Sequence, residues 1–234
     1  MKSRHRIFTK TIIYLLFFSY GVMHAQSKSY SVTSGEFIFG WNQIKFNQEP
    51  LNGDTHFTGF FHLTESRHFD FNNNFGFYTG LALRNIGYTT TDTTELYDKI
   101  KRRAYTIGVP LAIKLGDFRN NKFVYAGIEC EMAFHYKEKL WLNDEKSKSS
   151  EWFSSKTNRF LPSVFAGIQF NSSLNLQMKY YLNDFLNTHY TKGTYSLSPY
   201  NESKLFYLSV SWQLKPKAII NKMERETFPV MAKL

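Results

Sequence analysis

The sequence alternates apolar and polar residues over long stretches, which is the pattern of β-strands with two different faces. The clearest stretch is 123–140, where the even positions are apolar and most odd positions are polar or small. The apolar set is Val124, Ala126, Ile128, Cys130, Met132, Phe134 and Tyr136. An amphipathic helix repeats its apolar positions roughly every three to four residues and cannot produce this sorting. This stretch therefore predicts a long strand with one wholly apolar face.

Seven further segments show the same alternation, although the first two are less regular. They are 36–47, 57–71, 75–88, 102–115, 160–170, 174–182 and 206–213. In 57–71, Phe57 and Leu63 begin an apolar face, but Glu65 and Arg67 then fall on that face. A bulge or an early strand end would explain the change. Together with 123–140, these segments predict eight strands.

The connections between the segments alternate strictly between short and long. The short ones are 72–74, 116–121 and 171–173, and the long ones are 48–56, 90–101, 141–156 and 184–203. Bacterial outer-membrane barrels have short periplasmic turns and longer extracellular loops. We therefore predict an all-β fold over residues 26–214, an eight-stranded antiparallel up-and-down transmembrane β-barrel with a filled polar interior.

Alternation does not decide which face of the barrel points outward. A soluble lipocalin-like barrel, with its apolar residues inside, would show the same pattern. The polar faces are rich in glycine and alanine, which suits the crowded interior of an eight-stranded barrel. Aromatic residues also recur near strand ends, as in the girdles at membrane interfaces. These residues are Tyr105, Tyr136, Phe160, Phe170, Tyr180 and Trp212. Both features favour the barrel whose apolar face contacts lipid.

The first 25 residues have the pattern of a secretory signal peptide. An apolar stretch over 11–18 follows four basic residues, Lys2, Arg4, Arg6 and Lys10. We expect cleavage after about Ala25, because the apolar core is short for an uncleaved helical anchor. The mean hydropathy of −0.39 excludes a membrane protein built of several helices, which would need several long apolar runs.

The charge balance points to lipid and not to nucleic acid. The chain carries 29 basic and 19 acidic residues, a formal net charge of +10, and loss of the four basic residues of the signal peptide leaves +6. Exported proteins do not normally meet nucleic acid, so we predict no such partner. Lysine and arginine facing the anionic lipids of the outer membrane, lipopolysaccharide included, are the simpler interpretation. The single cysteine, Cys130, excludes an internal disulfide.

The sequence also resembles the PorT-like outer-membrane β-barrel proteins of Bacteroidetes-type bacteria. The resemblance lies in 76–88 (GFYTGLALRNIGY), 102–117 (RRAYTIGVPLAIKLGD), 123–139 (FVYAGIECEMAFHYKEK) and 179–187 (KYYLNDFLN). It covers most of the mature chain as a pattern of strands and implies an outer-membrane barrel of about eight strands. Some relatives are associated with the secretion machinery of these bacteria, a role that these motifs do not carry by themselves.

Charged residues on the inward faces form the candidate functional site. By alternation, Glu129 and Glu131 are expected to point inward, as are five cations: Arg84, Arg102, Lys114, Arg159 and Lys179. Paired carboxylates could act as a glycosidase-like acid and base. However, charges in a narrow lumen with little water must pair with one another. We interpret these seven residues as a structural network that fills the barrel, which is then not an open pore.

A small outer-membrane enzyme acting on acyl groups of lipid A or phospholipid is the alternative function. Such chemistry needs a serine, a histidine and an orienting acid. The candidates are His62, His68, His135 and His189 with Ser163, Ser196 and Ser198. We expect His135 to belong to the interior network or to the rim. Because no Gly-x-Ser-x-Gly, HExxH or EF-hand motif marks a site, we predict no catalytic, metal or cofactor-binding residues.

The long connections and the end of the chain are the expected partner surfaces. Residues 141–156 mix charges, serines and aromatics, and 184–203 are rich in tyrosine, which makes good contact surfaces. The tail, 215–234, is expected in the periplasm, with a short amphipathic helix over 218–226. We therefore predict a non-enzymatic barrel that serves as a structural or accessory subunit of a larger outer-membrane secretion or assembly complex.

Overall fold

The computed structural model of the protein describes residues 28–51, 53–91, 97–143, 145–170, 174–193 and 195–214. The predicted signal peptide, the connection 171–173 and the tail 215–234 lie outside the described residues. Within the described ranges, no helix is long and apolar enough to cross a membrane.

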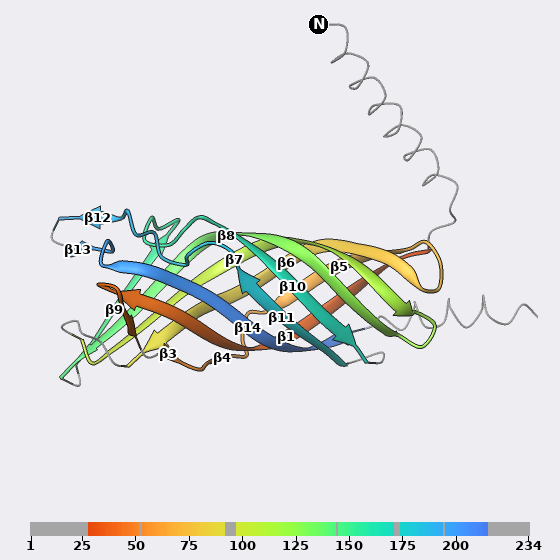
Figure 1. Ribbon diagram of the computed structural model, residues 1–234, viewed down its shortest axis with the longest axis horizontal. Helices are drawn as coiled ribbons and strands as arrows, with labels where there is room; N and C mark the ends of the chain where they lie inside the picture. The colour runs from red at the N-terminus through yellow and green to blue at the C-terminus, as the bar shows by residue number, and fades with distance from the viewer. Residues whose placement is uncertain are drawn as a thin grey trace, which may run out of the picture.

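Eight long strands pair in a closed ring (Figure 1). In ring order they are β1 (Lys28–Phe46), β5 (Leu63–Asp70), β6 (Phe75–Thr90), β7 (Lys99–Asp117), β8 (Lys122–Leu142), β10 (Phe160–Gln169), β11 (Leu174–Tyr181) and β14 (Tyr200–Leu214). Each strand is antiparallel to the next, and β14 closes the ring on β1. The predicted all-β, eight-stranded antiparallel barrel is confirmed.

The two ends of the barrel differ. Residues 71–74 and 118–121 make tight turns at one end, where β1 begins and β14 stops, and we name it the short-turn end. The opposite end, named the long-connection end, carries β9 (Glu145–Trp152), which extends β8 as a hairpin. It also carries the small hairpin of β12 (Thr191–Lys192) and β13 (Tyr195–Ser196), labelled at the left of Figure 1.

The segment 48–56 is not the long loop that the sequence predicted. The chain turns at Asn47 and Gln48, whose φ angles are 49° and 72°, and runs back beside β1. It does so as β2 (Glu49–Leu51), β3 (Gly53–Asp54) and β4 (His56–Thr58). Two successive residues with positive φ are the geometry of a tight hairpin turn, so the loop is replaced by paired strand.

The irregularity expected in 57–71 is a break between β4 and β5. Both β4 and β5 pair with β1. Thr58 of β4 pairs with Ile38 and Leu63 of β5 pairs with Gly35, so two residues of β1 lie opposite four residues, 59–62. Phe61 within this bulge has a φ of 65°. β5 then resumes with Glu65 and Arg67 exposed on the same exterior face as Phe57 and Leu63. The break is present, but its two extra residues preserve the alternation and do not move the charged residues off the apolar face.

The exterior of the barrel is largely apolar, whereas the interior buries many charged and polar side chains together with two clusters of apolar and aromatic ones. Exposed apolar side chains alternate with buried ones along β7, β10, β11 and β14. The exposed set includes Ile107, Val109, Leu111, Ile113, Leu115, Ile128, Val164, Ile168, Met178 and Trp212. The buried set includes Glu36, Arg84, Arg102, Lys114, Glu129, Glu131 and Lys179. The two faces therefore follow the alternation read from the sequence.

A bulge in β8 changes the faces of its last third. Tyr105 on β7 pairs with His135, but the next pair skips Phe134, which has no partner on β7. One extra residue inverts the alternation. Tyr136 is therefore fully buried inside the barrel and is not part of the expected exterior girdle. The residues that move to the exterior are His135, Lys137 and Lys139.

Replacing Gly127 by valine should destabilise the barrel. A Cβ at Gly127 would lie 2.2 Å from the carbonyl oxygen of Leu111 and 2.7 Å from the Cα of Ala112, both backbone atoms of β7. Because backbone atoms in a paired strand cannot move aside, we expect a loss of about 1–3 kcal/mol, measured by urea unfolding in detergent. Ala126→Val, on the exposed face of the same strand, is the control, and an unchanged midpoint for Gly127→Val would contradict this packing.

Candidate functional site

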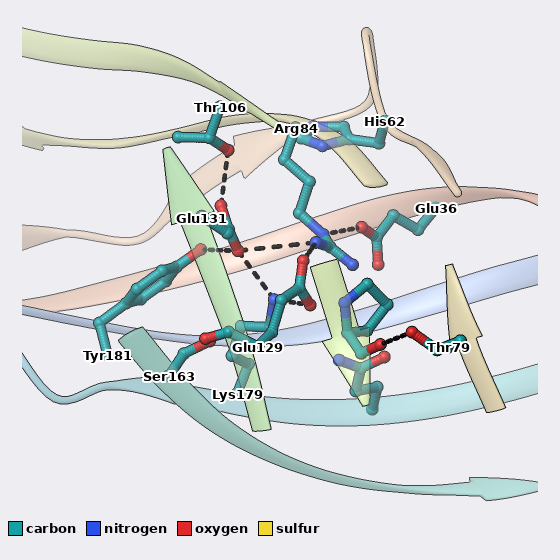
Figure 2. Close-up of polar contacts among 12 residues, drawn as sticks. Glu36, His62, Thr79, Arg84, Thr106, Glu129, Glu131, Ser163, Lys179 and Tyr181 are labelled. Carbon is teal, nitrogen blue, oxygen red and sulfur yellow. Dashed lines mark hydrogen bonds and ion pairs between the residues drawn. The ribbon is translucent and has the colours of Figure 1, made fainter. Parts of the chain in front are cut away.

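Four strands bring charged side chains together in the lumen (Figure 2). Arg84 on β6 forms an ion pair with Glu36 on β1, with 2.6 Å between Nε and Oε1, and a second pair with Glu129 on β8. The Lys179 Nζ on β11 lies 2.6 Å from Glu129 Oε2 and 2.8 Å from Glu131 Oε1. These five buried residues are named the central cluster.

Neutral groups complete the central cluster. Thr106 Oγ1 donates a hydrogen bond to Glu131 Oε2 at 2.5 Å, and the Tyr181 hydroxyl donates to Oε1 at 2.8 Å. Arg84 Nη1 also lies 3.5 Å from Glu131 Oε1. Buried charges are tolerated when they are paired and hydrogen-bonded. Because three carboxylates share two cations, each cation holds more than one carboxylate.

A second group lies toward the long-connection end. Arg102 Nε lies 2.8 Å from Glu138 Oε2, and both side chains are buried. Lys156 Nζ lies 3.7 Å from Glu138 and 3.1 Å from Glu151 on β9. A hydrogen bond from Ser154 and the Lys156 ammonium lower the pKa of Glu151, which lies beyond the barrel ring. These contacts connect the barrel interior to the β8–β9 hairpin.

A third group lies toward the short-turn end around Lys114, which is completely buried. Its Nζ lies 2.5 Å from Asp70 Oδ1, 3.0 Å from the Tyr30 hydroxyl and 3.1 Å from His68 Nδ1. The charged residues therefore form three separate groups along the lumen and not one network.

Arg159 differs from the expectation. Its side chain is exposed, and Nη2 lies 3.4 Å from the backbone oxygen of Phe153. Alternation along the predicted strand would turn Arg159 inward, but β10 begins only at Phe160, and the residue before it belongs to the connection. The other six predicted residues lie in the three groups described above.

Three buried carboxylates of these groups were not singled out from the sequence. Glu36 lies on the polar side of the first predicted strand, where alternation could have identified it. Asp70 follows the break in 57–71, which obscured the face of that segment. Glu138 is an even-numbered residue, so the alternation over 123–140 assigns it to the apolar face. Only the bulge in β8 places it inside the barrel. His62, in the bulge before β5, also lies beside Arg84 (Figure 2).

The lumen retains little free space. A cavity of about 50 Å³ lies between the central cluster and the Lys114 group, lined by Glu36, Arg84, His68, Tyr78 and Tyr125 among others. This volume holds a few water molecules and no larger ligand. In the part of the chain that the structure describes, no three His, Cys, Asp or Glu side chains gather as a metal site would require.

The serines and histidines proposed for catalysis do not assemble into a triad. His135 Nε2 lies 2.8 Å from Ser150 Oγ on the exterior, and His68 Nε2 lies 3.1 Å from Ser66 Oγ in the lumen. The three serines proposed from the sequence, Ser163, Ser196 and Ser198, take part in neither contact. Ser163 donates to the backbone oxygen of Glu129, and Ser196 donates to Ser198. The second nitrogen of His68 faces the Lys114 ammonium and not an acid.

No known protein family matches the chain, and no curated protein sequence does. Among solved structures, Neisserial surface protein A is similar, with 12% identity, a TM-score of 0.43, and 81% of this chain and 99% of that chain covered. Ail of Yersinia pestis, crystallised with the heparin analogue sucrose octasulfate, has 14% identity, a TM-score of 0.36, and coverages of 78% and 99%. The outer membrane protein OprG of Pseudomonas aeruginosa has 11% identity, a TM-score of 0.36, and coverages of 80% and 96%. These similarities concern the fold alone, which the strand pairing already establishes.

Removing the positive charge of Arg84 should strongly destabilise the barrel. Arg84→Met leaves Glu36 and Glu129 buried without their shared cation, and breaking a buried ion pair in this way costs about 3–5 kcal/mol. Urea unfolding in detergent measures the loss. Arg159→Met removes the same charge from an exposed position and should change stability by less than about 0.5 kcal/mol. Adding Glu129→Gln to Arg84→Met should restore part of the loss, and strict additivity would contradict the pairing.

Proposed function

We propose that this protein is an integral outer-membrane protein of the PorT-like kind, acting without catalysis as a structural or accessory subunit of a larger membrane complex. The exposed apolar side chains around the ring support membrane insertion. In water, a contiguous apolar surface of this extent would drive aggregation, whereas lipid accommodates it. The predicted signal peptide and the resemblance of 76–88 and 102–117 to PorT-like proteins support the same location.

The barrel has its short-turn end in the periplasm and its long-connection end outside the cell, as outer-membrane barrels do. The central cluster crosses the lumen between β1, β6, β8 and β11, which supports a closed barrel and not a diffusion channel. A closed barrel acts through its surfaces. The part of the protein available to partners is then the exterior of the ring and the hairpins beyond it.

One observation carries the proposal of a complex, namely a charged strip in the apolar exterior of β1 and β5. Glu65 pairs with Thr33 on one side and with the exposed Leu81 on the other, and Leu63 precedes it on the same exterior face. Thr33 donates a hydrogen bond to Glu65, and Arg67 Nη2 donates to Ser29 Oγ at 3.0 Å. An arginine that faces lipid carries a cost that depends on its depth, up to about 2–4 kcal/mol at the bilayer midplane and less near the interfaces. A protein partner with complementary polar groups would remove that cost.

Purification from outer membranes in mild detergent tests this function. We expect a partner to co-elute in fixed stoichiometry. The double variant Glu65→Leu, Arg67→Leu should stay in the outer membrane but recover at least about fivefold less partner, because it removes the polar contacts of the strip. The control, Ile113→Leu with Met178→Leu, changes exposed exterior positions elsewhere and should recover partner normally. A wild-type barrel that elutes alone would contradict the proposal.

The enzyme alternative depends on the contact between His135 and Ser150. His135 stacks on Tyr105 and Trp152, with ring centroids 5.4 Å and 4.4 Å away, and no carboxylate contacts it among the described residues. A triad needs such an acid to orient the histidine. We therefore expect His135→Ala to leave the acyl composition of lipid A and phospholipids unchanged, as measured by mass spectrometry of membrane lipids. Loss of a processed lipid species in this variant would favour the enzyme.

A further inference from the structure

The exterior of β7, β8 and β9 is strongly basic at the long-connection end. Beyond the bulge at Phe134, the outward side chains of these three strands are in register. Successive rows hold Lys99, Trp141 and Lys146, then Lys101, Lys139 and Lys148, then Arg103, Lys137 and Ser150. We name the seven cations of these rows the basic face.

The basic face lies directly beyond a row of aromatic rings, formed by Tyr105, His135 and Trp152 in register. The next outward residues toward the short-turn end are apolar, Ile107 on β7 and Met132 on β8. Aromatic rows of this kind mark the boundary between membrane hydrocarbon and water. The cations therefore lie at the height of the lipid head groups, next to the surface on which acyl chains would lie.

Charge is segregated between the two sides of this sheet. Beyond the bulge, the acidic residues of β8 and β9 are Glu138, Glu145 and Glu151, and they alternate onto the other side, where Arg102 and Lys156 pair with two of them. Within the described ranges, no salt bridge joins a cation of the basic face to a carboxylate. Like charges directly opposite one another on neighbouring strands destabilise a sheet. Among the residues that the structure describes, ion pairs therefore do not offset this repulsion.

The crowding has two consequences at positions beyond the aromatic row. Burial, together with the charges of Arg103 and Lys139, lowers the pKa of Lys101 to about 8. The Nε of Arg103 is buried and has no hydrogen-bond partner among the described residues. An anion bound over this face would relieve the repulsion and accept hydrogen bonds from these donors.

We propose that the basic face binds the phosphate groups of a phosphorylated glycolipid of the outer leaflet, of the lipopolysaccharide type. The inference rests on the membrane placement proposed above. A phosphate offers three acceptor oxygens and more than one negative charge. Arg103 suits a bidentate contact, and Lys101 and Lys139, opposed across a spacing of about 5 Å, suit a shared phosphate between them. The adjacent apolar exterior selects a lipid over a soluble anion, because only a lipid satisfies both surfaces.

Binding of a defined bisphosphorylated, acylated lipid A to the full exported chain in detergent micelles tests the proposal. The variant Lys101→Gln, Lys139→Gln, Lys148→Gln removes one row and should bind at least about tenfold more weakly, since each cation at a membrane surface contributes about 1 kcal/mol. The matched control removes three charges at the short-turn end, Lys28→Gln, Arg119→Gln and Lys122→Gln, and should bind as the wild type does. Native mass spectrometry counts bound lipids, and heat-dependent gel mobility verifies that each variant is folded.

Two further probes separate the sources of the anion. The first probe is lipid A without its phosphates, whose affinity for the wild type should be as low as the affinity of the row variant for intact lipid A. The second probe is inorganic phosphate alone, which should not displace lipid A from the wild type. Equal binding of intact lipid A by the wild type and the row variant would overturn the proposal, as would preferential binding of inorganic phosphate or of a soluble acidic protein. A wild-type chain that does not insert into micelles would instead refute the membrane placement, and this inference with it.

Discussion

The ion pairs of Arg84 at the centre of the barrel are the interaction on which the rest of the structure depends. A buried guanidinium requires carboxylate partners. Glu36 and Glu129 supply them from β1 and β8, each two strands away from β6 around the ring. These pairs therefore connect strands across the lumen, in addition to the buried apolar and aromatic clusters.

A filled interior moves function to the exterior. The apolar band is interrupted at two places, by Glu65 and Arg67 on β5 and by the basic face on β7, β8 and β9. The first lies toward the short-turn end, beside Ser29, Thr33 and Leu81, and the second lies beyond the aromatic row at the long-connection end, so they present different chemistry at different heights. A protein partner and a lipid head group can therefore occupy the same barrel without competing for one surface.

The bulge in β8 determines what the basic face contains, whereas the break at 59–62 does not change the exterior of β5. Its two extra residues preserve the alternation, so Glu65 and Arg67 stay on the same face as Phe57 and Leu63. The unpaired Phe134 turns Lys137 and Lys139 to the exterior and brings Glu138 inside to Arg102. Without that single residue, Lys137 and Lys139 of β8 would face the lumen, and the basic face would lose the cations between β7 and β9. One residue in the register thus decides both an interior ion pair and an exterior binding surface.

The sequence by itself determined the number of strands, the architecture, and the faces of most strands, because the alternation of side chains is a local property of each strand. It also identified six of the charged residues that lie inside. Tertiary structure decided which charges pair, that Arg159 stays outside, that 48–56 is paired strand, and where the bulges fall. These features depend on the register between neighbouring strands, which is set by pairing partners distant in sequence, and a shift of one residue in that register exchanges the two faces.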